Sequence, residues 1–78
     1  MKDFFIHQRQ NREVVIGGVR MLAEFMTEIV TVSVSGATIV VEGKNLEIGY
    51  FNVNEICICG TIESVHTNKT MHTRRGAK

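Results

Sequence analysis

Residues 29–42 read IVTVSVSGATIVVE and contain the clearest structural pattern in the chain. In the first six residues valine alternates with threonine and serine, so successive side chains would face opposite sides of a β-strand. Ser35 and Gly36 supply a two-residue connection, where glycine tolerates the positive φ of a tight hairpin turn. The alternation resumes from Ala37. This stretch therefore predicts an antiparallel β-hairpin.

The segments on either side of this hairpin continue the β pattern. Upstream, the β-branched run 14–16 ends at the glycine pair 17–18. Downstream, residues 43–45 (GKN) predict a second turn, 46–53 resume the alternation, and 52–54 predict a third reversal. The last strand is expected over 55–65, with Gly60 marking a bulge.

Residues 19–27 (VRMLAEFMT) are ambiguous. Leu22, Phe25 and Met26 share one face of a helix, but nine residues are few for a stable helix and both neighbouring segments favour strands. We expect an extended segment with a bend, and a short helix is the alternative.

These segments predict an all-β fold, a small antiparallel meander that rolls up or packs as a sandwich of about five to six short strands. The β domain is expected over 13–65, between an N-terminal arm (1–12) and a basic, flexible tail (66–78). The predicted core residues are Val30, Val32, Ile39, Val41, Leu46, Ile48, Ile56, Ile58 and Ile62.

The chain has 78 residues, so its core is thin, and self-association is a common remedy at this length. We therefore expect a homo-oligomer. The apolar stretches are too short for a membrane span or a signal peptide, which predicts an intracellular protein with two free thiols. Residues 1–65 carry five Lys/Arg and eight acids, a net charge of −3, whereas residues 66–78 carry four Lys/Arg and no acid.

Cys57 and Cys59 are two residues apart, so on a strand both thiols would face the same side and could contact one metal ion. A structural zinc site needs four ligands, and the three histidines lie in the predicted arm and tail. The pair is therefore interpreted as small, half-buried apolar side chains, and no metal site is predicted. A metal- or redox-responsive domain that uses this pair remains the alternative function.

No catalytic or cofactor-binding residues are predicted elsewhere, so we expect a protein that is not an enzyme. The histidines have no acidic partner at a convincing spacing, the serines lack a nucleophile elbow, and the glycines form no phosphate-binding loop. Four positive charges without aromatic residues in the tail predict no specific nucleic-acid binding.

Partner binding is the function class that these patterns favour. The strands expected over 29–34 and 37–41 carry no lysine or proline, and at a sheet edge they would offer an interface. Apolar residues on the face opposite the core would also need cover. The candidate interaction face therefore comprises Val40, Phe51, Cys57 and Cys59.

The ordered segments from Glu13 to Val65 resemble the YabP/YqfC family of sporulation proteins, more closely its YqfC-like branch. The resemblance rests on the strand 12–16, on Leu22, Phe25 and Ile29, on the segment 36–46 (GATIVVEGKNL) and on 55–65 (EICICGTIESV). It covers about two-thirds of the chain. Each piece is generic β sequence, and their order and spacing carry the resemblance.

This resemblance implies a non-enzymatic protein of endospore-forming bacteria. It would act in the mother-cell cytoplasm near the forespore membrane, contribute to assembly of the spore envelope, and bind protein partners that include a sporulation membrane protein. It also favours strand for residues 19–27. The chain departs from the family pattern at His66, where the family commonly has an aromatic residue, and in its Cys57/Cys59 pair and basic tail.

Overall fold

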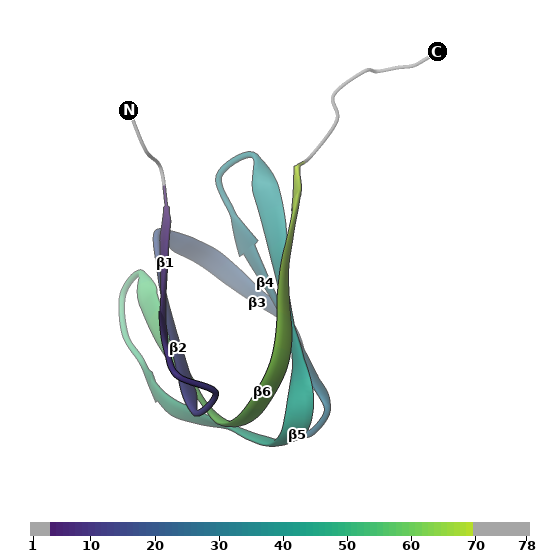
Figure 1. Ribbon diagram of the computed structural model, residues 1–78. Helices are drawn as coiled ribbons and strands as arrows, with labels where there is room; N and C mark the ends of the chain where they lie inside the picture. Colours follow the sequence, from purple (N-terminus) through teal and green to yellow (C-terminus); the bar gives the residue numbers. More distant parts are fainter. Residues whose placement is uncertain (1–3, 70–78) are drawn as a thin grey trace.

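The computed structural model describes residues 4–69, which form six β-strands and no helix (Figure 1). The strands form one antiparallel sheet in the order β1-β2-β6-β5-β4-β3. The all-β prediction is thus confirmed. None of the chain from residue 4 to residue 69 forms a helix capable of spanning a bilayer. The strand bounds are β1 Phe5–Arg9, β2 Glu13–Gly17, β3 Val19–Met26, β4 Ile29–Val34, β5 Ala37–Phe51 and β6 Glu55–Lys69.

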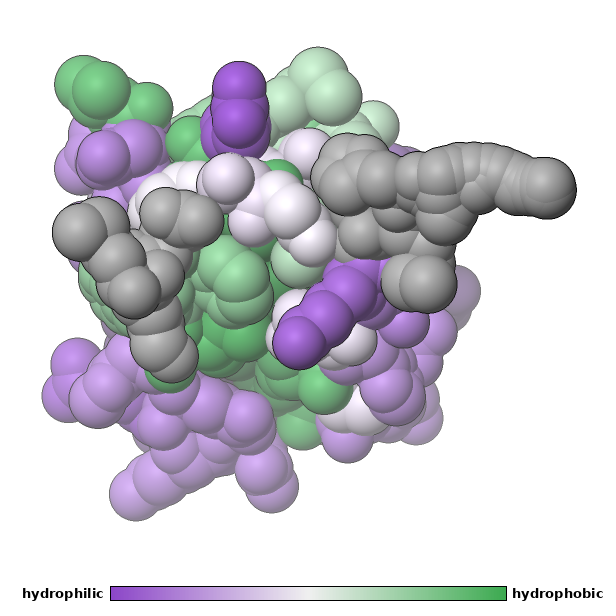
Figure 2. Space-filling view, turned by 90° about the horizontal axis from the view of Figure 1, so that it is seen from above, coloured by the Kyte–Doolittle hydropathy of each residue, from purple (hydrophilic) through white to green (hydrophobic). Residues whose placement is uncertain are grey.

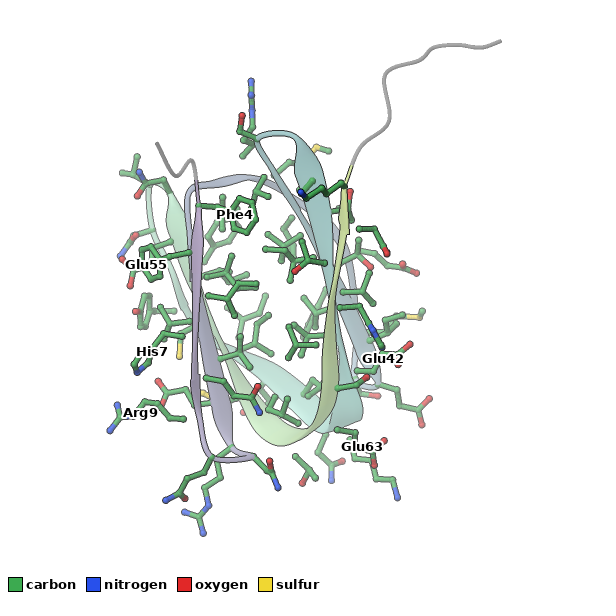
Figure 3. The ribbon with its side chains drawn as sticks, turned by 45° about the horizontal axis from the view of Figure 1, so that its top comes forward. Phe4, His7, Arg9, Glu42, Glu55 and Glu63 are labelled. Atoms are coloured by element: carbon green, nitrogen blue, oxygen red, sulfur yellow. The ribbon has the colours of Figure 1, made fainter. Side chains whose placement is uncertain are left out.

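The sheet bends into a U, because β5 and β6 each run for 15 residues and curve through its base (Figure 1). The first arm contains β1, β2, residues 55–59 of β6 and residues 47–51 of β5. The second arm contains β3, β4, residues 37–42 of β5 and residues 64–69 of β6. Side chains from both arms fill the space between them, and Phe4 points into this space near its mouth (Figure 3).

Two glycines permit the bend at the base of the U. A Cβ atom on Gly43 would clash with the carbonyl oxygen of Thr61, and one on Gly60 would lie 2.6 Å from the carbonyl oxygen of Asn45. Gly60 also has a φ of 135°, which side chains rarely allow. The β5–β6 register shifts between Lys44 and Glu47, on the same level as Gly60. Close approach of the two curved backbones therefore requires glycine at both positions.

The turn predicted at residues 43–45 is wrong. These residues continue β5, since the segments before and after them pair with β6 and not with each other. A local pattern of Gly-Lys-Asn favours both a turn and a bent strand, and the long-range pairing decides between them. The reversal predicted at 52–54 is confirmed, with the amide of Asn52 donating to the carbonyl of Glu55 over 2.9 Å.

The core lies between the two arms. All the predicted core residues are buried except Ile48, which is partly buried and packs against them. Five further core residues that were not predicted are also buried: Val14, Ile16, Val19, Val34 and Ala37. Full burial of a valine or isoleucine side chain contributes about 1.5–3 kcal/mol, so the buried core residues together stabilise the fold. From above, apolar residues are visible between polar rims at the mouth of the U (Figure 2).

Residues 19–26 form strand β3, as expected for an extended segment with a bend. Its register with β4 shifts twice, between Val19 and Met21 and between Leu22 and Glu24. The amides of Gly18 and Val19 both donate to the carbonyl of Asn54, so β3 begins beside the β5–β6 hairpin of the first arm and then joins the second arm. Pairing with β4 thus overrides the weak helical pattern.

The two strands that would have offered an interface at a sheet edge do not lie at an edge. Residues 29–34 and 37–41 lie inside the sheet, because β3 pairs with β4 and β6 pairs with β5. The outermost strands are β1 and β3, and the long strands β5 and β6 each have one side that is paired over only part of its length. Residues 5–9 of the expected N-terminal arm form β1, and β6 extends four residues beyond Val65 into the expected tail. The remaining residues of arm and tail, 1–3 and 70–78, lie outside the described part of the chain.

Candidate functional site

The outer face of the first arm carries the chemically richest group of side chains. Neighbouring positions in the sheet align Arg9, Glu13, Cys59 and Glu47 in one row, and His7, Val15, Cys57 and Tyr50 in the next. His7, Arg9 and Glu55 point away from the core on this arm (Figure 3). This surface is called the thiol face below and is defined by Phe5, His7, Glu13, Val15, Tyr50, Glu55, Cys57 and Cys59.

Cys57 is the buried centre of the thiol face. Only 3% of its surface is exposed, although it lies on the side of the sheet opposite the core. Its Sγ donates to Oε2 of Glu13 over 3.0 Å and lies 3.8 Å from Sγ of Cys59. Burial, followed by the hydrogen bonds with Glu13 and Cys59, raises the pKa of the Cys57 thiol to about 12. The thiol therefore stays protonated near neutral pH.

Gly49 leaves the space that the two sulfur atoms occupy. A Cβ atom at this position would lie 2.9 Å from Sγ of Cys59 and 3.3 Å from Sγ of Cys57. The β5–β6 register also shifts between Ile48 and Tyr50, and this shift aligns Tyr50 with Cys57. The thiol pair is thus part of the packing of β5 against β6.

Two aromatic rings flank this centre and remain exposed. The phenol of Tyr50 donates to Oε2 of Glu55 over 2.7 Å, and this bond is the main reason that the pKa of Tyr50 is raised to about 12. The ring of Phe5 lies over Gly17, where it occupies the place that a Cβ would take. Phe5 is 49% exposed and Tyr50 is 42% exposed. The thiol face therefore presents aromatic surface to solvent.

The thiol face does not assemble a metal centre. Within residues 4–69 no three His, Cys, Asp or Glu side chains come together in an arrangement that could hold a metal ion. Cys57 and Cys59 are free thiols. Metal binding would require the loss of the proton that Cys57 shares with Glu13, and the raised pKa opposes that loss.

The outer face of the second arm combines polar side chains with the exposed Met21 and Met26 of β3. Val40 lies there between Thr31 and His66 on the neighbouring strands. Glu42 Oε1 accepts a hydrogen bond from Ser64 over 3.0 Å and lies 3.8 Å from Nε2 of His66. Because the serine donates to the carboxylate and not to the imidazole, this group lacks the order of a hydrolytic triad.

A small hollow lies at the β1–β2 turn. It has a volume of about 300 Å³ and is lined by Arg9, Gln10, Arg12 and Glu13. Arg9 pairs with Glu13 over 3.8 Å at its side. The lining is polar and open to solvent, and it belongs to one hairpin.

The structure distributes the four predicted interaction residues over three places. Cys57 and Cys59 share the thiol face, but Val40 lies on the outer face of the second arm. Phe51 aligns with the buried Ile56 at the β5–β6 hairpin, where it is 47% exposed. Sequence reasoning missed Phe5, Tyr50 and Glu13, because β1 was not expected and the bulge at Gly49 moves Tyr50 to the outer face. The apolar run Phe4-Phe5-Ile6 in the expected N-terminal arm was the one available indication for Phe5.

A known protein family matches most of this chain. The model of the YabP family matches residues 5–74, which include all six strands. The chain belongs to the YabP family. No curated protein and no solved structure gave a significant match. YabP family membership confirms the resemblance seen in the sequence and suggests a sporulation-related protein, without distinguishing the YqfC-like branch.

Proposed function

We propose that this YabP family protein is a non-enzymatic assembly module of the developing spore envelope. It acts in the mother-cell cytoplasm near the forespore membrane, associates with itself, and binds a second protein, for which a sporulation membrane protein is our candidate. Family membership supports the sporulation role.

The observation that carries the binding role is the exposed aromatic surface of the thiol face. Phe5 and Tyr50 are large, partly apolar side chains that lose water-exposed surface when a partner covers them, and aromatic residues dominate binding energy at interfaces. At the adjoining hairpin, Phe51 is 47% exposed and Val53 is 95% exposed. The second arm also exposes apolar side chains on β3, at Met21, Phe25 and Met26, so the assignment of partner binding to the first arm rests on the two aromatic rings that flank Cys57.

The chemistry of the thiol face supports a binding role over a reactive one. Cys57 is held as a protonated thiol by burial and by Glu13, so it is a poor nucleophile. A metal- or redox-responsive domain is therefore the less supported alternative, and the Cys57/Cys59 pair is better explained as packing.

A localisation experiment tests this proposal. A fluorescent fusion of the full chain is expressed in a sporulating host that lacks the native copy, and its position relative to the forespore is followed. We expect the fusion to gather at the forespore boundary and a double variant, Phe5→Ser with Tyr50→Ser, to stay diffuse. The matched control is Met21→Ser with Met26→Ser, which removes exposed apolar residues from β3 instead. Diffuse wild-type protein, or equal loss in both variants, would contradict the proposal.

A further inference from the structure

The second arm ends in an unpaired strand edge. From Ser64 to Lys69, β6 pairs with β5 on one side, and within residues 4–69 no strand pairs with its other side (Figure 1). Strand β2 occupies that side only along residues 55–59. The amides of Gly60 and Ile62 then bond to the carbonyls of Arg12 and Asn11, and the pairing stops there.

Backbone polar groups of this edge point away from the sheet. The amide of Gly43 donates to Glu28 on the β4 side, so alternation along β5 also directs Val41 and Ile39 toward β4. Val65 and Thr67 lie opposite these residues on β6. In an antiparallel pair of strands, two residues opposite each other direct their N–H and C=O groups either both toward the partner strand or both away from it. Val65 and Thr67 therefore direct these groups away from β5, toward the open side of β6.

This edge is more regular than the other long edges of the sheet. The register of β3 with β4 shifts twice, and the second half of β5 shifts at Gly49. Such bulges twist an edge away from an incoming strand. Strand β1 has an even register but only five residues. Residues 64–69 of β6 pair with β5 without any shift, which leaves a straight edge open to pairing.

The charges on this edge favour a second copy of the same strand, in antiparallel orientation. The edge begins beside Glu63 and ends at Lys69, and both side chains are exposed. Antiparallel self-pairing brings each Glu63, which lies 3.9 Å from Nζ of its own Lys44, near the partner's Lys69, whereas parallel pairing places like charges together. A two-fold axis at His66 sets Val65 opposite the partner's Thr67, so their outward backbone groups meet. Val65 is only partly buried in the single chain and gains cover.

We propose that two copies of this protein pair through residues 64–69 of β6, antiparallel about a two-fold axis at His66. The two second arms then form one continuous sheet, and the thiol faces remain free for another partner. This inference specifies the self-association included in the proposed function and rests on it, but it does not depend on the thiol face.

Disulfide trapping tests the register. In this pairing the two His66 residues form a non-hydrogen-bonded pair with Cα atoms about 4.5 Å apart, within the range that a disulfide spans. We expect His66→Cys to form a covalent dimer under mild oxidation by oxidised glutathione, with the linkage assigned by mass spectrometry. The matched control is Asn68→Cys, which is also exposed but lies opposite the partner's Ser64. Equal trapping of both variants, or none in either, would overturn the proposal.

A charge exchange gives an independent measurement on the full chain. Glu63→Lys alone and Lys69→Glu alone each place like charges together, and we expect each to raise the dimer dissociation constant about tenfold, equivalent to ~1.4 kcal/mol. The double variant restores opposite charges and should dimerise like the wild type in sedimentation equilibrium. A dimer dissociation constant that is the same in all three variants as in the wild type would contradict this interface but not self-association. A monomeric wild type would contradict both the interface and self-association. The localisation experiment on the thiol face does not depend on this result.

Discussion

The thiol of Cys57 donates a hydrogen bond to the carboxylate of Glu13 over 3.0 Å, joining β6 to β2 across 44 residues of sequence. The pair lies on the side of the first arm that faces away from the core. A carboxylate therefore orients a thiol that is buried on the outer side of the sheet.

This relationship predicts how stability depends on pH. The pKa of Cys57 is raised from 9.0 to about 12 in the folded protein, so above pH 9 the unfolded chain loses the proton more readily than the folded one. The stabilising contribution is complete below pH 9 and is lost as pH rises toward 12. We expect Cys57→Ser, which keeps a donor to Glu13 but does not ionise in this range, to flatten the decrease. Urea unfolding between pH 7 and 11 measures the effect, and equal slopes for variant and wild type would contradict it.

The raised pKa of Tyr50 also lowers stability at alkaline pH, so the effect of Tyr50 has to be measured together with that of Cys57. Its pKa is raised from 10.0 to about 12 by the hydrogen bond to Glu55, so it also favours the folded state below pH 10 and loses that contribution above it. Tyr50→Phe should therefore remove part of the alkaline decrease that persists in Cys57→Ser. No change on adding this substitution would show that the bond does not persist in solution.

Thiol labelling should distinguish the two cysteines. Cys57 is buried and keeps its proton, whereas Cys59 is partly exposed. We expect iodoacetamide at pH 8 to modify Cys59 in the folded protein well before Cys57, and to modify both after unfolding in urea. Peptide mass spectrometry reports the order. Equal rates in the folded protein would mean that the thiol face is more open than the structure indicates.

Substitutions at two glycines should differ in cost and in rescue. In Gly43→Ala the new methyl meets the backbone carbonyl of Thr61, which side-chain rotation cannot relieve, so we expect a loss of about 3 kcal/mol. In Gly49→Ala the methyl meets sulfur atoms, and a smaller loss of about 1 kcal/mol is expected. Cys59→Ala should restore stability to Gly49→Ala and leave Gly43→Ala unchanged. Denaturant unfolding measures all four variants, and rescue of Gly43→Ala would refute the backbone contact.

The local pattern was sufficient for most of the strands, though not for β1, and for much of the core. Valine and isoleucine at alternate positions, with a Ser-Gly turn between them, correctly predicted the hairpin formed by β4 and the start of β5. The same parity identified eight of the nine predicted core residues as buried, since side-chain direction in a strand is a local property. The order of the segments also indicated the family, which the comparison confirmed.

The candidate site could not be predicted in the same way. Glu13 and Cys57 are brought together by β2–β6 pairing, and Tyr50 reaches their face only because of the bulge at Gly49. Neither relationship leaves a periodic trace in the sequence. Residues 43–45 likewise look like a turn until the continuous pairing with β6 is known.

By itself the sequence determined that the chain forms β-strands, many of the residues that face its core, and which family it belongs to. Only the tertiary structure decided that β5 and β6 bend instead of turning, which strands lie at the edges, and that a buried thiol meets Glu13. The physical reason is that strand alternation depends on neighbouring residues, whereas strand order, bending and burial on the outer face depend on hydrogen bonds between residues far apart in the chain.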